Sequence, residues 1–449
     1  MSLSQARIKE LSPSEQDVRA SFDVSTAILH KRTYPINEQD SYSLRTTKQL
    51  NYEIFAPGFK ILCNTLYLVG YFTITQNGNI VDPASVDLQI NPDVGFHSFI
   101  NAIHTRFESD PSPTVETQNE TNLRTRFDNF LKNDSMDQAA HLSTSIQGLG
   151  DNRKAVKPLL YGVTGTTLKG KGLAFAFPPH FILNSARPGD KFSARQTGRV
   201  YIKVILEELR KALFSSTISE ATLGQYDINF YDMYWAYETM ADDGKDSTCV
   251  FKTVQHTSFL LNSSQVTAPL KFTTGNCFAI VGRAMKQSER ESLLYDNFTF
   301  SPTPGTQKDA SVSNPYNGFS QLQFLLNDNI TGIQAEPLDD RLSIVMNGIL
   351  AGKLTPMNLN DPSAYDLVNC GFASHALYDP THKDSYIFGL AFKRLIDLSR
   401  NKLSIYVKSD VTNNDPYEVD VFGYFQYVLP SSVNPQYMEP RKPAQQLSM

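Results

Sequence analysis

Apolar and polar residues alternate along much of this chain, and a period of two is the spacing of β-strands. The clearest cases are Leu403–Val407 and Tyr417–Tyr427, where apolar or aromatic residues recur at every second position. Ile61–Thr75, Ile228–Tyr237 and Leu342–Gly348 are runs rich in β-branched, aromatic or other apolar residues. Gly, Pro, Asn and Asp clusters separate such runs. The pattern predicts an all-β protein built as a sandwich or barrel.

Helical spacing is much rarer. Thr121–Lys132 is predicted to be a helix, because Leu123, Phe127, Phe130 and Leu131 recur at intervals of three and four. Lys203–Leu213 has helical propensity, but Val200–Leu206 also alternates, which favours a strand that runs into a short turn or helix. We expect exposed loops at 133–157 and 303–317, where no period is visible.

The length of 449 residues favours two domains, because single cores rarely grow this large. The polar, glycine-containing segment Ala241–Ser247 is the best candidate for a boundary, since strand-like runs flank it. Residues 1–20 are polar and predicted to form an N-terminal arm. Four prolines after residue 429 predict an extended tail. The predicted units are therefore 1–20, 21–242, 243–430 and 431–449.

The charge balance argues against direct binding of nucleic acid. The net charge is −5 and the isoelectric point about 5.9. Within the first twenty residues, basic and acidic side chains are equal in number: Arg7, Lys9 and Arg19 against Glu10, Glu15 and Asp17. An arm that condensed a genome would need an excess of positive charge to neutralise phosphates. We therefore do not expect direct genome binding.

The cysteines and the terminal sequence bear on the compartment. Four cysteines are scattered without a CxxC pair, and we expect reduced core residues: Cys63, Cys249, Cys277 and Cys370. The N-terminus has no apolar signal region, and no stretch approaches the roughly 20 apolar residues that span a bilayer. A protein that is soluble by itself and assembled inside a cell is the expectation.

No motif in the sequence predicts catalysis. Gly165–Gly172 has the GxxxxGK frame of a phosphate loop, but Gly172 stands where the hydroxyl that ligates magnesium is required. No HExxH, GxSxG or Cys/His zinc pattern occurs. We expect core or surface histidines with ordinary hydrogen bonds at His30, His97, His104, His141, His180, His256, His375 and His382.

Charged clusters also favour ordinary surface roles. The acid pairs Asp242-Asp243 and Asp339-Asp340 are adjacent in sequence, so on a strand they would point to opposite faces. A basic group could contact nucleic acid or anionic lipid, but solvated surface charge is the favoured interpretation: Lys169, Lys171, Arg187, Lys191, Arg195 and Arg199. We expect no enzyme activity, and we assign no catalytic, cofactor-binding or metal-binding residue and no cofactor.

The order of several segments resembles the double jelly-roll major capsid proteins of eukaryotic DNA viruses, in particular the polinton and virophage group. Val94–Phe107, taken as a long strand or strand pair, precedes the helix of 121–132. An apolar strand at Phe278–Arg283 is followed by an Asn-Pro-rich loop and a strand ending in a polar turn at Leu322–Asp328. Closing strands follow in the order Tyr386–Phe392, Lys402–Lys408 and Tyr417–Leu429.

The resemblance covers most of residues 45 to 430, as a succession of loose patterns. It implies two jelly-roll β-sandwich domains in tandem, with short helices in loops. It also implies a homotrimer with a pseudo-hexagonal outline, which packs against neighbouring capsomers to build an icosahedral virion shell. Penton and minor capsid proteins would be partners, and an internal membrane or a core protein would contact the genome. The segment 133–157 and the turn around Leu206 depart from the family pattern.

Two alternatives remain open at this stage. One is a penton or minor capsid protein with a single jelly roll and an added domain, against which the two similar-sized halves argue. The other is a β-sandwich carbohydrate-binding module or glycosidase, which would use exposed aromatic residues or a spatial pair of carboxylates. The missing signal peptide argues against a secreted glycan binder.

Overall fold

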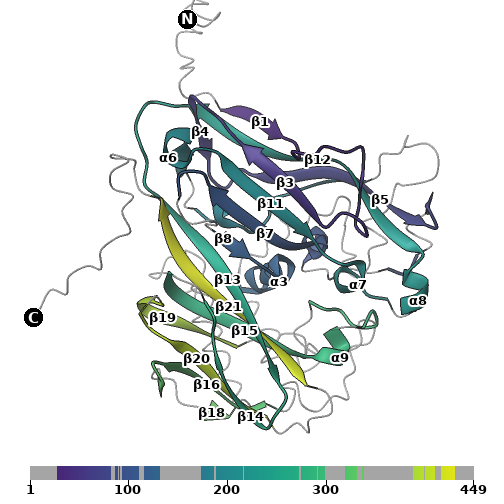
Figure 1. The fold of residues 1–449 in the computed structure, drawn as a ribbon, viewed down its shortest axis with the longest axis vertical. Helices are drawn as coiled ribbons and strands as arrows, with labels where there is room; N and C mark the ends of the chain where they lie inside the picture. Colours follow the sequence, from purple (N-terminus) through teal and green to yellow (C-terminus); the bar gives the residue numbers. More distant parts are fainter. Residues whose placement is uncertain are drawn as a thin grey trace, which may run out of the picture.

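A computed structural model shows the protein as two β-sandwiches, one above the other in Figure 1. It describes residues 28–81, 86–88, 91, 94–110, 116–131, 173–186, 189–215, 217–272, 275–290, 292–298, 319–330, 336–337, 388–398, 400–409 and 416–429.

The first sandwich pairs a large sheet with a smaller one, and every strand pairing in it is antiparallel. The large sheet has the order β10 (Lys191–Ser193), β4 (Phe59–Leu62), β12 (Tyr226–Ala241), β5 (Tyr67–Gln76) and β6 (Asn79–Ile80), with β1 (Leu29–Thr33) and β2 (Tyr42–Ser43) on β12 and β9 (Leu173–Phe177) on β5. The smaller sheet has the order β3 (Gln49–Ile54), β11 (Val200–Leu206), β7 (Ile100–Phe107) and β8 (Glu116–Gln118).

The second sandwich is built in the same way from later strands. Its first sheet has the order β13 (Cys249–Leu261), β21 (Tyr417–Leu429), β15 (Asn276–Lys286) and β19 (Phe388–Asp397). Its second sheet has the order β14 (Gln265–Pro269), β20 (Leu403–Ser409), β16 (Phe319–Leu326) and β17 (Asn329–Ile330), with β18 (Glu336–Pro337) also on β16.

The helices in the described part are short and lie in the connections, apart from α3 (Thr121–Leu131). This helix lies between the two sandwiches in Figure 1. The others are η3 (Gly95–Phe99), η5 (Ile182–Asn184), α6 (Ala194–Thr197), α7 (Leu209–Ala212), α8 (Glu220–Leu223) and α9 (Gln287–Arg290).

Each sandwich has its own apolar core, but the first core also includes residues of strands β13 and β21, which belong to the second sandwich. Trp235 and a group of phenylalanines fill the first core, with Phe96 stacked on Phe175 at 4.1 Å between ring centroids. Cys249 and Phe251 from β13 and Leu429 from β21 also belong to this core. Leu261 of β13 and Val419, Val421 and Phe425 of β21 belong to the second core, so both strands contribute to both cores.

Most of the predicted elements that fall on described residues are confirmed. Strands occupy Tyr226–Ala241, Leu403–Ser409 and Tyr417–Leu429, and the alternation over Val200–Leu206 marks a strand that leads into α7. The helix begins at Thr121 as expected. The predicted strand at 342–348 and the predicted loops at 133–157 and 303–317 lie outside the described residues.

The prediction of a long strand or strand pair over Val94–Phe107 was wrong in its first part. Gly95–Phe99 form a 3-10 helix, and only Ile100–Phe107 are a strand. Gly95 has a φ of 60°, which suits glycine, and all five residues of the turn are buried. Their side chains therefore do not divide into an inner and an outer face, as an amphipathic strand requires.

The segment between β12 and β13 connects the two sandwiches. Asp243, Gly244 and Lys245 are exposed, while Gln196 donates a hydrogen bond of 2.7 Å to the Ser247 carbonyl. Arg195 pairs with Asp242 at 3.2 Å. The limits of the arm, the two jelly rolls and the tail at residues 20, 242 and 430 stay predictions.

Candidate functional site

The charged junction between the two sandwiches is the main polar feature of the described residues. It is built on β21, whose two faces are both covered. Val419, Val421 and Phe425 pack in the second core. The residues between them face the other way, towards α3, where the Phe422 ring lies 5.4 Å from the ring of Phe127. The strand therefore alternates between an apolar core and a charged junction.

Asp420 is the centre of this junction and is fully buried. Its Oδ1 lies 2.9 Å from His256 Nε2, on the neighbouring strand β13. Arg283, which stands opposite Asp420 in the register of β15 and β21, places its Nε 3.4 Å from Oδ2. Both partners come from strands that flank β21, so pairing of the sheet brings them together.

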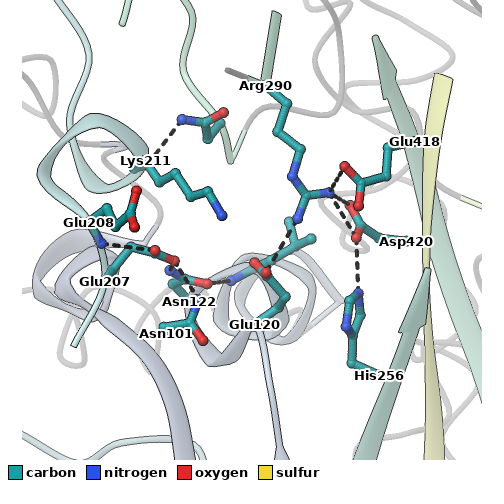
Figure 2. Close-up of polar contacts among 12 residues, drawn as sticks. Asn101, Glu120, Asn122, Glu207, Glu208, Lys211, His256, Arg290, Glu418 and Asp420 are labelled. Carbon is teal, nitrogen blue, oxygen red and sulfur yellow. Dashed lines mark hydrogen bonds and ion pairs between the residues drawn. The ribbon is translucent and has the colours of Figure 1, made fainter. Parts of the chain in front are cut away.

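Arg290 extends the junction beyond the sheet. It ends α9, directly after β15, and its Nη1 donates to both oxygens of Asp420 at 2.9 and 2.8 Å. The same guanidinium pairs with Glu418 and with Glu120, each at 3.3 Å. Figure 2 shows Arg290 between the two acids of β21 and Glu120, which precedes α3. We call Glu120, His256, Arg283, Arg290, Glu418 and Asp420 the junction cluster.

Burial and pairing have opposite effects on the acids of the junction cluster. Burial alone would raise the pKa of Asp420, but Arg290, the hydrogen bond from His256 and Arg283 together hold that pKa well below its ordinary value. Glu120 differs, because burial raises its pKa and the attraction of Arg290 offsets this only in part. Burial lowers the pKa of Arg290, but Asp420, Glu120 and Glu418 reverse this and leave it raised.

Glu120 has an unusual backbone. Its φ is 52°, in the left-handed region that few non-glycine residues adopt. Its carbonyl accepts the first hydrogen bond of α3, from the Arg124 amide at 2.9 Å. A residue in this conformation reverses the chain between β8 and α3, and it directs the Glu120 carboxylate towards Arg290.

The start of α3 is also held from the first sandwich. Glu207, at the end of β11, accepts hydrogen bonds from Asn122 at 3.0 Å and from Asn101 at 2.8 Å. Asn122 is fully buried and Glu207 nearly so. Figure 2 shows this second acid on the opposite side of the helix from Arg290. The N-terminal turn of α3 is thus fixed by one sandwich on each side.

A third set of contacts joins the sandwiches further along α3. The Tyr424 hydroxyl of β21 donates to Asp128 at 2.8 Å, and burial raises the pKa of this tyrosine. Asp128 also pairs with Arg124 at 3.2 Å and His180 at 3.5 Å. These bonds orient the second sandwich against α3 as well as against the junction cluster.

The sequence analysis did not predict the junction cluster. Apart from His256, the candidate residues that it named do not belong to this cluster. Arg195 and Arg199 of the basic group pair with Asp242 and Glu53, while Lys169, Lys171 and Arg187 lie outside the described residues. So does Gly165–Gly172. Among the described histidines, only His256 belongs to the cluster. His30 is near Glu238, His97 and His180 face each other, and His104 contacts Asn119. His141, His375 and His382 lie outside the described residues.

Cys63, Cys249 and Cys277 are free and buried, as expected for reduced core cysteines, whereas Cys370 lies outside the described residues. Within the part that the structure describes, no group of three or more His, Cys, Asp or Glu could hold a metal ion. No helix in that part is long and apolar enough to cross a membrane. The visible chemistry of the junction is ion pairing, which holds two sandwiches in one orientation.

The fold is similar to those of solved viral capsid structures. The Faustovirus major capsid protein matches with a TM-score of 0.56 at 8% identity, over 96% of this chain and 98% of its own. VP54 of PBCV-1, fitted into a cryo-EM reconstruction of the virophage Sputnik, matches with a TM-score of 0.53 at 10% identity, over 90% of this chain and 95% of its own. A quasi-atomic model of the PBCV-1 capsid matches with a TM-score of 0.52 at 10% identity, over 90% of this chain and 94% of its own.

Sequence comparison adds no further relative: no family model matches the chain, and no curated protein matches it. The structural similarity covers both sandwiches and nearly the whole of each matched chain. The tandem arrangement of two sandwiches is thus shared with those capsid proteins. The chain has the double jelly-roll fold of major capsid proteins of DNA viruses.

Proposed function

We propose that the chain is the major capsid protein of a DNA virus, a structural protein that builds an icosahedral virion shell. The observation that carries this proposal is the match of the whole double sandwich to viral capsid proteins, with at least nine-tenths of both chains covered. A carbohydrate-binding module or a protein with one jelly roll would account for only one of the two sandwiches.

The proposed unit of assembly is a homotrimer with a pseudo-hexagonal outline. Two similar sandwiches per chain give three chains six lobes, which approximates sixfold symmetry from a threefold particle. This requires a constant angle between the sandwiches, because a variable angle would spoil the lateral contacts between capsomers. The junction cluster and the Tyr424–Asp128 bond hold α3 at two points along its length, at its start and at Asp128, and this supports such rigidity.

The proposed partners follow from the same arrangement. Each capsomer would contact copies of itself, with penton and minor capsid proteins closing the shell. The N-terminal arm of residues 1–20, ahead of jelly rolls at 21–242 and 243–430 and a tail at 431–449, would face the interior. Its balanced charge argues against direct genome binding, so an internal membrane or a core protein would contact the genome in its place. The virion is the proposed location, with assembly inside the host cell.

Light scattering coupled to size-exclusion chromatography tests this function directly. The purified full-length protein should elute as a stable trimer or as larger shells, and negative-stain electron microscopy should show particles with a hexagonal outline. A protein that stays strictly monomeric at all concentrations and binds sugar would overturn the proposal in favour of the carbohydrate-binding alternative.

A further inference from the structure

Two buried thiols lie side by side where the connecting segment enters the second sandwich. Cys63 follows β4 of the first sandwich, and Cys249 is the first residue of β13. Both are free and buried, with exposed fractions of 4% and 0%. The two thiols are close enough for each to shift the pKa of the other, although 185 residues lie between them in the sequence. We call Cys63 and Cys249 the thiol pair.

The backbone around the thiol pair is held firmly. The Cys63 amide donates to the Asp190 carbonyl at 2.9 Å, and Cys249 Sγ contacts the next carbonyl, that of Lys191, at 3.2 Å. Lys191 is itself paired with Leu62 in the register of β10 and β4. Both cysteines thus contact consecutive residues at the start of β10, Asp190 and Lys191, and the pairing of β10 with β4 brings them together.

The two thiols are chemically unequal. The hydrogen bond from Cys63 lowers the pKa of the Cys249 thiol, against the effect of burial. The same bond, together with burial, raises the pKa of Cys63 well above its ordinary value. A pair in which one thiol stabilises the thiolate of the other is the arrangement that favours thiol–disulfide exchange. Cys277 differs, since burial raises its pKa to about 12.

We propose that the thiol pair is a modification site at which a small organic disulfide, such as oxidised glutathione, closes an intrachain bond between Cys63 and Cys249. The Cys249 thiolate attacks one sulfur of the reagent, which forms a mixed disulfide and expels one thiolate. Cys63 then loses its proton and attacks the Cys249 sulfur, expelling the second thiolate. Both leaving groups take up protons, so the protein loses two hydrogens and the reagent becomes two thiols.

In this proposal, local opening of the connecting segment gives the reagent access to the thiol pair. Asp243, Gly244 and Lys245, shortly before Cys249, are exposed, and Gly244 and Lys245 are held by hydrogen bonds from their amides to aspartate side chains. Local opening of such a segment costs far less free energy than global unfolding. Once closed, the bond ties the end of β4 to the start of β13 and encloses strands β5 to β12 of the first sandwich, which restricts the unfolded chain.

The experiment treats the folded full-length protein with oxidised glutathione, alkylates the remaining thiols in denaturant and maps the peptides by mass spectrometry. We expect a cross-linked peptide containing Cys63 and Cys249, with two of the four thiols lost to alkylation. The oxidised protein should also unfold at a temperature roughly 5 °C above that of the reduced protein, because the bond closes a long loop.

Cys63→Ser and Cys249→Ser should each abolish the cross-linked peptide and the thermal shift, whereas Cys277→Ala, at a buried cysteine of the second core, should retain both. Absence of the Cys63–Cys249 peptide from the oxidised wild-type protein overturns the proposal, as does a thermal shift that persists in Cys63→Ser. If a serine variant fails to fold, the wild-type peptide map decides the question alone.

Discussion

Asp420 is a carboxylate with no exposure to solvent, yet its contacts leave it charged. Two guanidinium groups and an imidazole surround it within hydrogen-bond distance. Transfer of a carboxylate from water into a protein interior costs several kcal/mol, which only close and well-oriented partners offset. Removal of the charge would leave Arg283 and Arg290 buried without their main counter-ion.

Asp420→Asn should lower the free energy of unfolding at neutral pH by about 3–5 kcal/mol, since it breaks a buried pair from one side. Urea denaturation followed by tryptophan fluorescence measures this, because the single tryptophan, Trp235, is buried in the first core. Asp328→Asn is the matched control: it removes an exposed partner of Lys402 and should change the free energy by less than about 1 kcal/mol. Equal effects of the two substitutions would contradict a central role for Asp420.

The difference in the free energy of unfolding between wild type and Asp420→Asn should change with pH in one direction. The pKa of Asp420 is lower in the folded than in the unfolded protein, so its contribution is present above the ordinary value of 3.8 and is lost as the pH falls towards the folded value. The gap between wild type and Asp420→Asn should therefore be widest near pH 7 and shrink below about pH 3.8.

The sequence could not identify Asp420 as buried, because its pattern has two interpretations. In Tyr417–Tyr427, Glu418 and Asp420 alternate with valines, which is what a strand with one solvated face shows. The second face is covered by α3, and its charges are satisfied by Arg290 and His256, 130 and 164 residues away. No local window of sequence contains that information.

At the scale of elements, α3 is the part that joins the two sandwiches. Its first turn is held by Glu207 of the first sandwich and, through Glu120, by Arg290 of the second. Phe127 packs on Phe422 near its middle, and Asp128 accepts from Tyr424. Helical spacing in Thr121–Lys132 predicted the helix itself, but the apolar residues that marked it do not say which surface they meet.

Glu120→Gln tests the charge at this end of α3. The pKa of Glu120 is raised by folding, so the stability linked to its protonation is present below its ordinary value of 4.5 and is lost as the pH rises through the folded value. Glutamine cannot ionise, so the variant should gain stability relative to wild type between about pH 4.5 and 7, as measured by urea midpoints. A difference that is constant with pH would contradict this.

Val200–Leu206 and Gly95–Phe99 show why one element was predicted correctly from the sequence and the other was not. Val200–Leu206 has a strict alternation of buried and half-buried residues, which made the strand visible against its helical propensity. Gly95–Phe99 is buried at every position, so the run resembled a strand although it is a 3-10 turn. Periodicity distinguishes a strand from a turn most clearly where the two faces of the element differ in burial.

For the whole molecule, β13 and β21 connect the two cores. Phe251 and Leu429 belong to the first core, while Leu261 and Val419 belong to the second. Calorimetry should therefore show one cooperative transition, with equal calorimetric and van't Hoff enthalpies. Phe251→Ala should lower the free energy of unfolding of the whole protein by about 3–5 kcal/mol. The variant should still unfold in a single transition. Two separate transitions would contradict the coupling.

Removal of residues 1–20 should separate assembly from folding. The arm has few large apolar residues, so its loss should leave the trimer intact while shell formation fails. Light scattering of the truncated protein measures the first outcome and electron microscopy of assembly reactions the second. Loss of the trimer would contradict the assignment of this segment as an arm.

The shared strands also have a consequence for the order in which the protein is made. A ribosome releases the chain from its N-terminus, and an early domain can usually fold before later ones exist. Here the first core includes Leu429, which emerges after almost all other residues of both cores. The first sandwich can therefore complete its apolar core only after the last strand of the second has been translated.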